Sequence, residues 1–345
     1  MDLKTPKTPI TLIAFAALTI AVLMPFILSG CTPHSSKAAL DLYAEPWELS
    51  GDLGAHDPAI AREGGKWYVY YTGIGIRSKS SADGRVWEDG PSLIANLPTW
   101  VKDYVPTSSR NFWAPDIARV KVAGKDRWAL FYSVSTFGKN RSVIGLATNE
   151  TLDAASKTYA WKDEGPIISS RQGDDYNAID PAYVEDEEGR PYLVFGSFWD
   201  GIRLVALDKT TLKPAADAEL LPLARRDGVG AIEAPFIVRR GEWYYLFVSF
   251  DFCCKKTESD YKIAYGRANK IEGPYVDKSG VPMLEGGGTI LDSGDERRKG
   301  PGHCAVYQSG DQAILVNHFY DAENLGNATL QIRPLRFDEA GWPEL

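Results

Sequence analysis

Three carboxylic acids stand next to prolines at widely separated points of this 345-residue sequence. Asp57 and Asp180 each directly precede a proline, and Glu233 stands two residues before one. If folding brings them to one cavity, burial and mutual repulsion raise the pKa of at least one of them. One carboxyl kept protonated and another kept ionised can hydrolyse an acetal, because the first protonates the leaving oxygen while the second activates a water.

The three carboxylates belong to a sequence repeat that occurs five times. Each copy has a proline, a short alternating run, a turn and then an aromatic or aliphatic run, which is the pattern of a β-hairpin. The copies are HDPAIAREGGKWYVYYTG from His56, WAPDIARVKVAGKDRWALFYS from Trp113, IDPAYVEDEEGRPYLVFGS from Ile179, IEAPFIVRRGEWYYLFVS from Ile232 and GPGHCAVYQSGDQAILVNH from Gly300. Further strand-like stretches fill the intervals, and repeats of four strands are typical of propeller blades.

The repeat predicts an all-β fold, a five-bladed β-propeller over residues 45–345. The first strand of each propeller blade lines a central channel, so the five motifs are expected to share one mouth. The residue before a proline is driven into extended geometry, which we expect to aim Asp57 and Asp180 into that mouth. Asp116, which follows the proline of the second copy, is interpreted as structural. A β-sandwich is the alternative, but it gives no reason for five similar hairpins.

The N-terminal thirty residues have a different character. Two lysines precede a long apolar run that ends in LSGC. This pattern predicts an export signal over residues 1–30, with Cys31 as a lipidated first residue and residues 31–44 as a tether. An uncleaved membrane anchor is the alternative. Both interpretations place the rest of the chain outside the cytoplasm, and lipidation predicts a membrane-anchored lipoprotein of the periplasm or cell surface.

Composition and cysteine content exclude other classes. The chain is 44% apolar with a formal net charge of −8 and has no block rich in Lys and Arg, which excludes a binder of the nucleic-acid backbone. Cys253, Cys254 and Cys304 fit neither a disulfide framework nor a zinc pattern. The adjacent pair can form a vicinal disulfide in an oxidising compartment or remain two buried thiols, and the sequence leaves both open.

In order and spacing, the motifs resemble those of the arabinanases of glycoside hydrolase family 43. The resemblance covers Ala55 to Tyr320 and is carried by HDPAI, NFWAPD, YNAIDPAY, GSFWDGI, IEAPF, FDFCC, DYKIAYGR and GPGH. It implies a five-bladed propeller and an inverting hydrolase of α-1,5-linked arabinan, the polymer of pectin side chains, cleaved most often inside the chain. Membrane contact would come only through the lipid anchor.

The resemblance also implies roles for individual residues. Asp57 takes the place of the general base, Glu233 that of the general acid, and Asp180 that of a third carboxylate that tunes the pKa of the acid and orients it. His303 of GPGH matches a histidine that helps to hold a hydrated ion, commonly calcium, in the central channel. The charge of such an ion would influence the pKa values of the carboxylates.

Six residues near the motifs are expected to contact the sugar, four by stacking and two by hydrogen bonding. They are Phe112, Trp113, Phe198 and Trp199, and Asn177 and Ser197. Two alternative functions stay open. One is an exo-acting α-L-arabinofuranosidase or β-xylosidase of the same fold, and the other is a non-catalytic propeller that binds surface glycans. The sequence CCKK, where arabinanases tend to continue CCRG, leaves the balance of endo and exo cleavage open.

Overall fold

The computed structural model describes residues 9, 40–43, 47–122, 124–228 and 230–345. The predicted signal segment, apart from Pro9, and the predicted lipidation site Cys31 lie outside the described residues. Within these described ranges, no helix has the length and apolar character needed to cross a membrane.

The compact unit begins at Leu40, inside the segment predicted as a tether. Leu42 is fully buried, and the hydroxyl of Tyr43 donates a hydrogen bond to the backbone oxygen of Leu335 at 2.9 Å. Burial of a leucine side chain stabilises this contact by roughly 1.5–3 kcal/mol. The predicted domain boundary at residue 45 is therefore corrected to Leu40.

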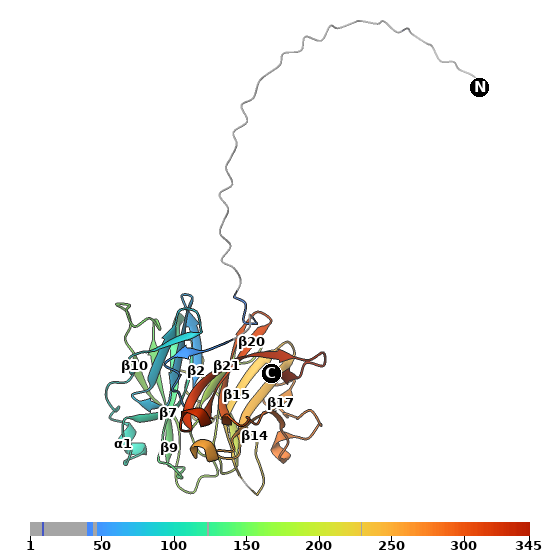
Figure 1. The fold of residues 1–345 in the computed structure, drawn as a ribbon. Helices are drawn as coiled ribbons and strands as arrows, with labels where there is room; N and C mark the ends of the chain where they lie inside the picture. Colours follow the sequence, from blue (N-terminus) through green and yellow to red (C-terminus); the bar gives the residue numbers. More distant parts are fainter. Residues whose placement is uncertain (1–8, 10–39, 44–46, 123, 229) are drawn as a thin grey trace, which may run out of the picture. The chain divides into compact units, whose positions relative to one another are not determined.

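Five β-sheets follow one another along the chain and form a ring, which confirms the predicted five-bladed β-propeller (Figure 1). Blade 1 contains β1 (Ser50–Gly51), β2 (Ala59–Glu63), β3 (Lys66–Tyr71), β5 (Arg77–Ser81) and β6 (Val86–Asp89). Blade 2 contains β4 (Gly73–Ile74), β7 (Asn111–Val122), β8 (Lys125–Val134), β9 (Ser142–Asn149) and β10 (Lys162–Ser170). Blade 3 contains β11 (Ala182–Glu185), β12 (Pro191–Phe195), β13 (Ile202–Ala206) and β14 (Leu221–Ala224).

The remaining two blades each have four strands. Blade 4 contains β15 (Ile232–Arg240), β16 (Trp243–Phe250), β17 (Lys262–Ala268) and β18 (Thr289–Asp292). Blade 5 contains β19 (Arg298–Ser309), β20 (Gln312–Asp321), β21 (Asn327–Phe337) and β22 (Pro343–Glu344). Helical structure in the described residues is limited to α1 (Val101–Tyr104) and short 3-10 turns at Lys256–Glu258, Met283–Glu285 and Ala322–Asn324.

The ring closes between blade 5 and blade 1. The first strands β2, β7, β11, β15 and β19 contact one another in that order, and β19 in turn contacts β2. The chain just before β2 also pairs with β21, through bonds from Ala55 N to Ala328 O at 3.1 Å and from Leu330 N to Leu53 O at 2.8 Å. In Figure 1 the red strands β20 and β21 accordingly lie beside the blue β2. Closure holds the five first strands around one channel.

The core consists of five apolar clusters, each lying between two neighbouring blades. Tyr70 and Leu130 belong to the cluster between blades 1 and 2, and Trp67 and Val316 to the one between blades 5 and 1. Side chains alternate across a strand, so runs such as WYVYY and ALFYS bury both faces of their sheet. The blades are therefore held at fixed positions by packing on both sides.

The five motifs form bends at the start of the first strands. Pairing of the first strand with the second shifts register at the motif in blades 2, 4 and 5. One residue at each bend has a positive φ: +55° at Asp57, +45° at Ala114, +58° at Asp180, +52° at Ala234 and +50° at His303. The expectation of an extended backbone before the prolines is therefore wrong for Asp57 and Asp180. Left-handed residues at such bends redirect side chains out of the regular strand alternation.

Candidate active site

A ring of hydrogen bonds links the five bends to one another. In each blade, the backbone N–H of the positive-φ residue donates to a side chain of the preceding blade. The bonds are Asp57 N to His318 Nδ1 (3.1 Å), Ala114 N to Thr72 Oγ1 (2.8 Å), Asp180 N to Ser133 Oγ (3.0 Å), Ala234 N to Asp180 Oδ2 (3.0 Å) and His303 N to Ser249 Oγ (2.8 Å). Each blade thus fixes the bend of the next one.

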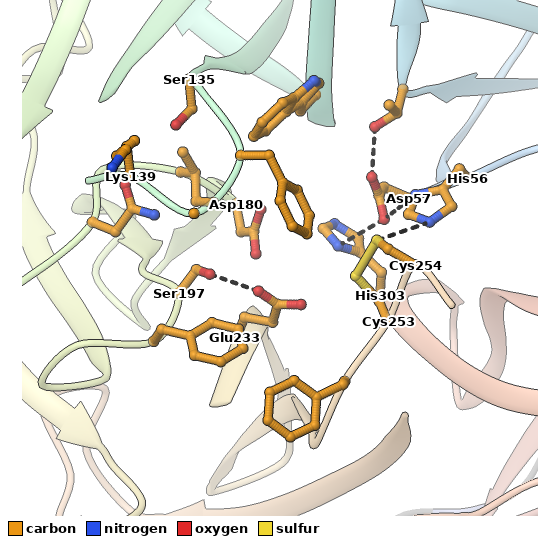
Figure 2. Close-up of a pocket in the computed structure, with 18 of the residues that line it drawn as sticks. His56, Asp57, Ser135, Lys139, Asp180, Ser197, Glu233, Cys253, Cys254 and His303 are labelled. Atoms are coloured by element: carbon orange, nitrogen blue, oxygen red, sulfur yellow. Dashed lines mark hydrogen bonds and ion pairs between the residues drawn. A yellow bond between two sulfur atoms is a disulfide. The ribbon is translucent and has the colours of Figure 1, made fainter. Parts of the chain in front are cut away.

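The bends surround a cavity of about 810 Å³ (Figure 2). Asp57, Asp180 and Glu233 all line this cavity, and their exposed fractions are only 8%, 7% and 8%. Figure 2 shows the three side chains around one common space, with Asp57 on the side of His303 and Asp180 beside Glu233. The structure therefore brings together the three carboxylates that the sequence singled out.

Asp57 is surrounded by hydrogen-bond donors and imidazoles. Thr72 Oγ1 donates to Oδ2 at 2.5 Å, while Oδ1 lies 2.8 Å from His56 Nδ1 and 3.2 Å from His303 Nδ1. Burial alone would raise the pKa of Asp57, but the neighbouring imidazoles of His56, His303 and His318 lower it well below its usual range. Asp57 is therefore an ionised carboxylate near neutral pH.

Glu233 and Asp180 have the opposite tendency. Burial raises the pKa of Glu233 and the charge of Asp57 raises it further, although two hydroxyl groups favour the ionised form. Ser197 Oγ donates to Oε2 at 2.6 Å, and the hydroxyl of Tyr261 donates to Oε1. Burial and then the charges of Glu233 and Asp57 raise the pKa of Asp180 well above its usual range. These carboxyls therefore hold protons to higher pH than Asp57 does.

The arrangement can divide acid and base work between two carboxyls. Environments that push the pKa values of two neighbouring groups apart indicate which of them gives a proton and which takes one. Asp57 suits the base, because its pKa is lowered, and Glu233 suits the acid, because burial raises its pKa. Asp180 accepts the N–H of Ala234, the residue after Glu233, and so helps to hold the strand that carries the acid.

The structure places five of the six predicted sugar contacts in the cavity wall. They are Trp113, Asn177, Ser197, Phe198 and Trp199. Phe112 is fully buried and packs edge-to-face on Tyr132, with ring centroids 5.2 Å apart. Successive side chains of β7 point to opposite sides, so Trp113 faces the cavity and Phe112 faces the core. The prediction of a sugar contact by Phe112 is therefore corrected to a packing role.

Both residues that were predicted to hydrogen-bond the sugar already have protein partners. Ser197 Oγ donates to Glu233, and Asn177 Oδ1 accepts from Ser142 Oγ at 2.6 Å. Ser197 therefore orients a carboxyl of the site as well as facing the cavity. The amide nitrogen of Asn177 carries the hydrogens that remain for a ligand.

Several cavity residues were not singled out from the sequence. They include His56, Thr72, Phe137 and Tyr261. A signal for Thr72 existed, because a polar residue ends the apolar second-strand run of every copy: YT, YS, GS, VS and NH. Phe137 lies between β8 and β9 and is 77% exposed, and a single aromatic in a loop carries no comparable signal.

The adjacent cysteines also line the cavity. Cys253 and Cys254 form a disulfide, which decides between the two alternatives that the sequence left open. Cys304 is a buried free cysteine.

The groups beside Asp57 fit a cation held through water. His56, Asp57 and His318 present potential ligand atoms within 4.8 Å of one another. His318 Nδ1 accepts the N–H of Asp57, so its buried Nε2, which has no hydrogen-bond partner among the described residues, carries a hydrogen for a water. Burial lowers the pKa of both His318 and His303, so both are neutral, as a cation site requires. Where His303 turns a protonated Nδ1 toward Asp57, its Nε2 offers a lone pair.

Comparison with known proteins agrees with the fold. The family model "Glycosyl hydrolases family 43" matches residues 51–343. Extracellular endo-alpha-(1->5)-L-arabinanase 1 of Bacillus subtilis (strain 168) is 44% identical, over 86% of this chain and 89% of the relative. Extracellular exo-alpha-(1->5)-L-arabinofuranosidase ArbA of Cellvibrio japonicus (strain Ueda107) is 40% identical, over 90% of this chain and 92% of the relative.

A solved structure is similar to this chain over nearly the same share of its length. The family 43 endo-arabinanase of Bacillus licheniformis is 47% identical with a TM-score of 0.81, and the similarity covers 87% of this chain and 100% of that one. A propeller whose bends gather three carboxylates is thus matched along nearly its whole length by hydrolases of one family. This chain is a glycoside hydrolase and belongs to glycosyl hydrolases family 43.

Proposed function

We propose that this protein is an inverting hydrolase that cleaves internal α-1,5-L-arabinofuranosidic linkages of arabinan. The observation that carries the proposal is a pair of carboxyls with divergent pKa values in one cavity. The imidazoles beside Asp57 lower its pKa, whereas burial raises the pKa of Glu233. A propeller that only bound glycans would have no use for this pair, so the binding alternative is not favoured.

The chemistry follows from the two protonation states. Glu233 gives its proton to the glycosidic oxygen as the bond from that oxygen to the anomeric carbon breaks. Asp57 takes a proton from a water whose oxygen attacks the anomeric carbon from the opposite side, which inverts the configuration. Asp180 supports the acid by accepting the N–H of Ala234, and we expect its carboxyl to tune the pKa of Glu233. Trp113 and Trp199 in the cavity wall offer flat faces for the sugar rings.

Arabinan is proposed as the substrate because relatives that cover most of the chain are named for its linkages. Sequence identity does not separate endo from exo cleavage. The endo-acting relatives of Bacillus subtilis and Bacillus licheniformis are 44% and 47% identical, an exo-1,5-alpha-L-arabinanase from a bovine ruminal metagenomic library is 44% identical, and the exo-acting Cellvibrio japonicus relative is 40% identical. Exo cleavage of the same linkage is the second candidate, because this relative covers the chain equally well.

Product analysis separates these candidates. The purified protein is incubated with linear arabinan, branched arabinan and xylan, and product sizes are followed over time. Oligomers of medium length that appear early from linear arabinan support endo cleavage, and release of one short product from the first minutes supports exo cleavage. Products from xylan alone would contradict the arabinan assignment, and no product from any of the three would support a binding module.

We also propose that the protein is exported and anchored through lipid on Cys31. Both curated relatives described above are named as extracellular, which supports export. The apolar run that ends in LSGC supports lipidation. A Cys31→Ser variant should lose incorporation of labelled fatty acid and leave the membrane fraction. A variant that kept both would contradict the anchor.

A further inference from the structure

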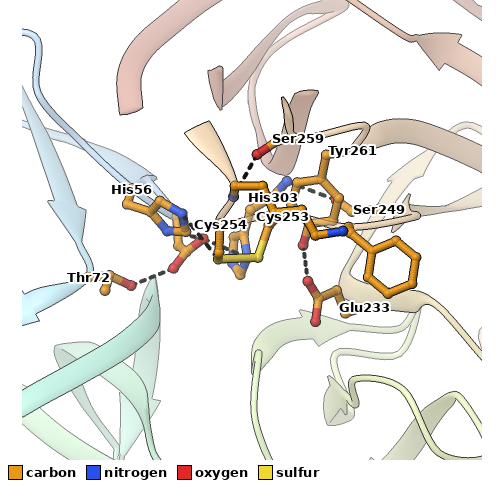
Figure 3. Close-up of a disulfide and its surroundings, with 12 residues drawn as sticks. His56, Thr72, Glu233, Ser249, Cys253, Cys254, Ser259, Tyr261 and His303 are labelled. Atoms are coloured by element: carbon orange, nitrogen blue, oxygen red, sulfur yellow. Dashed lines mark hydrogen bonds and ion pairs between the residues drawn. A yellow bond between two sulfur atoms is a disulfide. The ribbon is translucent and has the colours of Figure 1, made fainter. Parts of the chain in front are cut away.

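The disulfide of Cys253 and Cys254 lies in the cavity wall beside His56 (Figure 3). The disulfide follows β16 of blade 4 in the chain. Its segment lines the cavity and contacts His56 of blade 1 and Tyr320 of blade 5. Cys254 Sγ lies 3.8 Å from His56 Nε2. Neither the acid nor the base step proposed above uses this disulfide.

A chain of close polar contacts, made of two hydrogen bonds and one ion-pair contact, runs from the disulfide segment to Asp57. The backbone N–H of Cys254 donates to the hydroxyl oxygen of Tyr320 at 2.8 Å. That oxygen lies 2.8 Å from His56 Nε2, and His56 Nδ1 lies 2.8 Å from Asp57 Oδ1. Tyr320 is nearly buried, with an exposed fraction of 4%, so water does not readily replace these partners.

The contacts of this chain are compatible with both protonation states of His56. The carboxylate of Asp57 can only accept, so His56 Nδ1 carries the hydrogen that faces it. Nε2 accepts from the hydroxyl of Tyr320 in the neutral ring and donates to its oxygen in the imidazolium, so this contact is kept in both states. The oxygen of Tyr320 is in turn free to accept the N–H of Cys254. Each group in the chain is therefore oriented by the one before it, starting from the peptide of the disulfide.

We propose that the Cys253–Cys254 disulfide is a positioning element for the catalytic carboxylate Asp57, acting through Tyr320 and His56. This inference rests on the proposed function, in which Asp57 is the general base. Reduction breaks the bond between the two side chains, and we expect the freed segment to shift Cys254 from its place beside Tyr320 and His56. A general base loses efficiency when it is held less well against the attacking water.

A phosphine can supply the two electrons that reduction of the Cys253–Cys254 disulfide requires. The phosphorus atom gives two electrons to the S–S bond, which breaks, and takes up the oxygen atom of one water to become a phosphine oxide. The two hydrogens of that water end on the two sulfur atoms as thiols. A thiol titration before and after treatment should therefore show two additional thiols per chain.

The experiment compares kcat and KM on linear arabinan for oxidised and phosphine-reduced protein. Losing one oriented hydrogen bond is expected to lower kcat about five- to tenfold on reduction. Tyr320→Phe, which keeps the ring and removes the hydroxyl, should lower kcat by a similar factor. Reduction of Tyr320→Phe should then lower kcat less than about twofold further, because coupled changes are not additive. The change in KM on reduction should be the same in both proteins, since the disulfide lines the cavity in each.

A matched control shows that the phosphine acts through this bond. The double variant Cys253→Ser, Cys254→Ser has no disulfide, so its kcat should resemble that of the reduced protein and should not respond to the phosphine. Wild-type protein that gained two thiols with no change in kcat would overturn the proposal. A reduced Tyr320→Phe protein that lost the full five- to tenfold again would overturn the path through Tyr320.

A readout without substrate separates this inference from the proposed function. A wild-type protein that does not cleave arabinan contradicts the proposed function, and the imidazole resonances of His56 still report on the coupling. These resonances should shift on reduction of the wild type and stay unchanged on reduction of Tyr320→Phe. Resonances that do not move in the wild type would overturn the proposal whatever the activity.

Discussion

At the scale of single residues, the groups that touch each carboxyl set its role. Asp57 faces imidazoles and a hydroxyl donor, whereas Glu233 is buried and receives hydrogen bonds only from hydroxyl groups. Three carboxylates with similar sequence surroundings therefore acquire different pKa values. Substitutions of Glu233 and Ser197 test this difference in pKa.

Replacing Glu233 with glutamine should lower kcat on arabinan by about 10²–10⁴-fold, because the amide cannot protonate the leaving oxygen. An aryl arabinoside with a good leaving group needs no such proton, so its cleavage should fall much less. Asp57→Asn is the comparison, because loss of the base should slow both substrates equally. An equal loss on both substrates in Glu233→Gln would contradict the acid role.

Replacing Ser197 with alanine should move the alkaline limb of the pH profile of kcat/KM to higher pH. The reaction needs protonated Glu233 and is lost as pH rises through the pKa of this carboxyl. The hydroxyl of Ser197 favours the ionised form, so its removal raises that pKa further. Ser135→Ala removes another cavity hydroxyl that does not touch Glu233, and it should leave the alkaline limb in place. A limb that moved to lower pH in Ser197→Ala would contradict this account.

At the scale of elements, the bend at the start of each first strand positions the site. A regular strand would alternate its side chains between the two faces of the sheet, whereas a left-handed residue at the bend turns one of them aside. Such residues cost roughly 1–3 kcal/mol each unless the surroundings hold them. The N–H of each bend donates to a side chain of the preceding blade, and this bond helps to hold the bend.

Ser133→Ala tests the contribution of one such bond. The substitution leaves the N–H of Asp180 buried without its partner, so the free energy of unfolding should fall by about 1–3 kcal/mol. Urea denaturation measures this change. Ser309→Ala, at the partly exposed end of β19, is the control and should change the free energy of unfolding by less than about 0.5 kcal/mol. Equal stability of the two variants would contradict a structural role for the bond.

At the scale of the whole molecule, closure of the ring makes the site a shared property of all blades. Asp57 depends on His318 and His303 of blade 5, and Glu233 depends on Ser197 of blade 3. The same closure brings the histidines of blade 5 next to Asp57, and we propose that a hydrated cation binds there. The charge of such an ion would favour the ionised form of Asp57.

Cation binding can be measured directly. We expect calcium to bind the chelator-treated protein in a calorimetric titration and to raise its melting temperature, because a ligand that binds only the folded state stabilises it. His303→Ala should weaken both effects. Equal calcium affinity in the wild type and in His303→Ala would contradict a role for this histidine, and no calcium binding to either protein would contradict the ion itself.

Much of this molecule was predictable because its signals are local and repeated. A hairpin pattern needs only about twenty residues, and five copies of it indicated five blades and a shared channel. The carboxylates Asp57, Asp180 and Glu233 stood one or two residues before the prolines of three copies, so the repeat predicted that they meet. Five of the six predicted sugar contacts line the cavity for the same reason, since they flank the motifs.

The tertiary structure decided the features that depend on contacts between blades. Asp57 and its partner His318 are separated by 261 positions in the chain, and no local pattern encodes such a pair. Packing between blades places the side chain of Phe112 in the core. The left-handed backbone at Asp57 and Asp180 occurs together with hydrogen bonds from these residues to the preceding blade. Residue types and spacing thus determined which groups converge. Only the closed ring determined what each of them touches, because pKa values and orientation arise from neighbours that are distant along the chain.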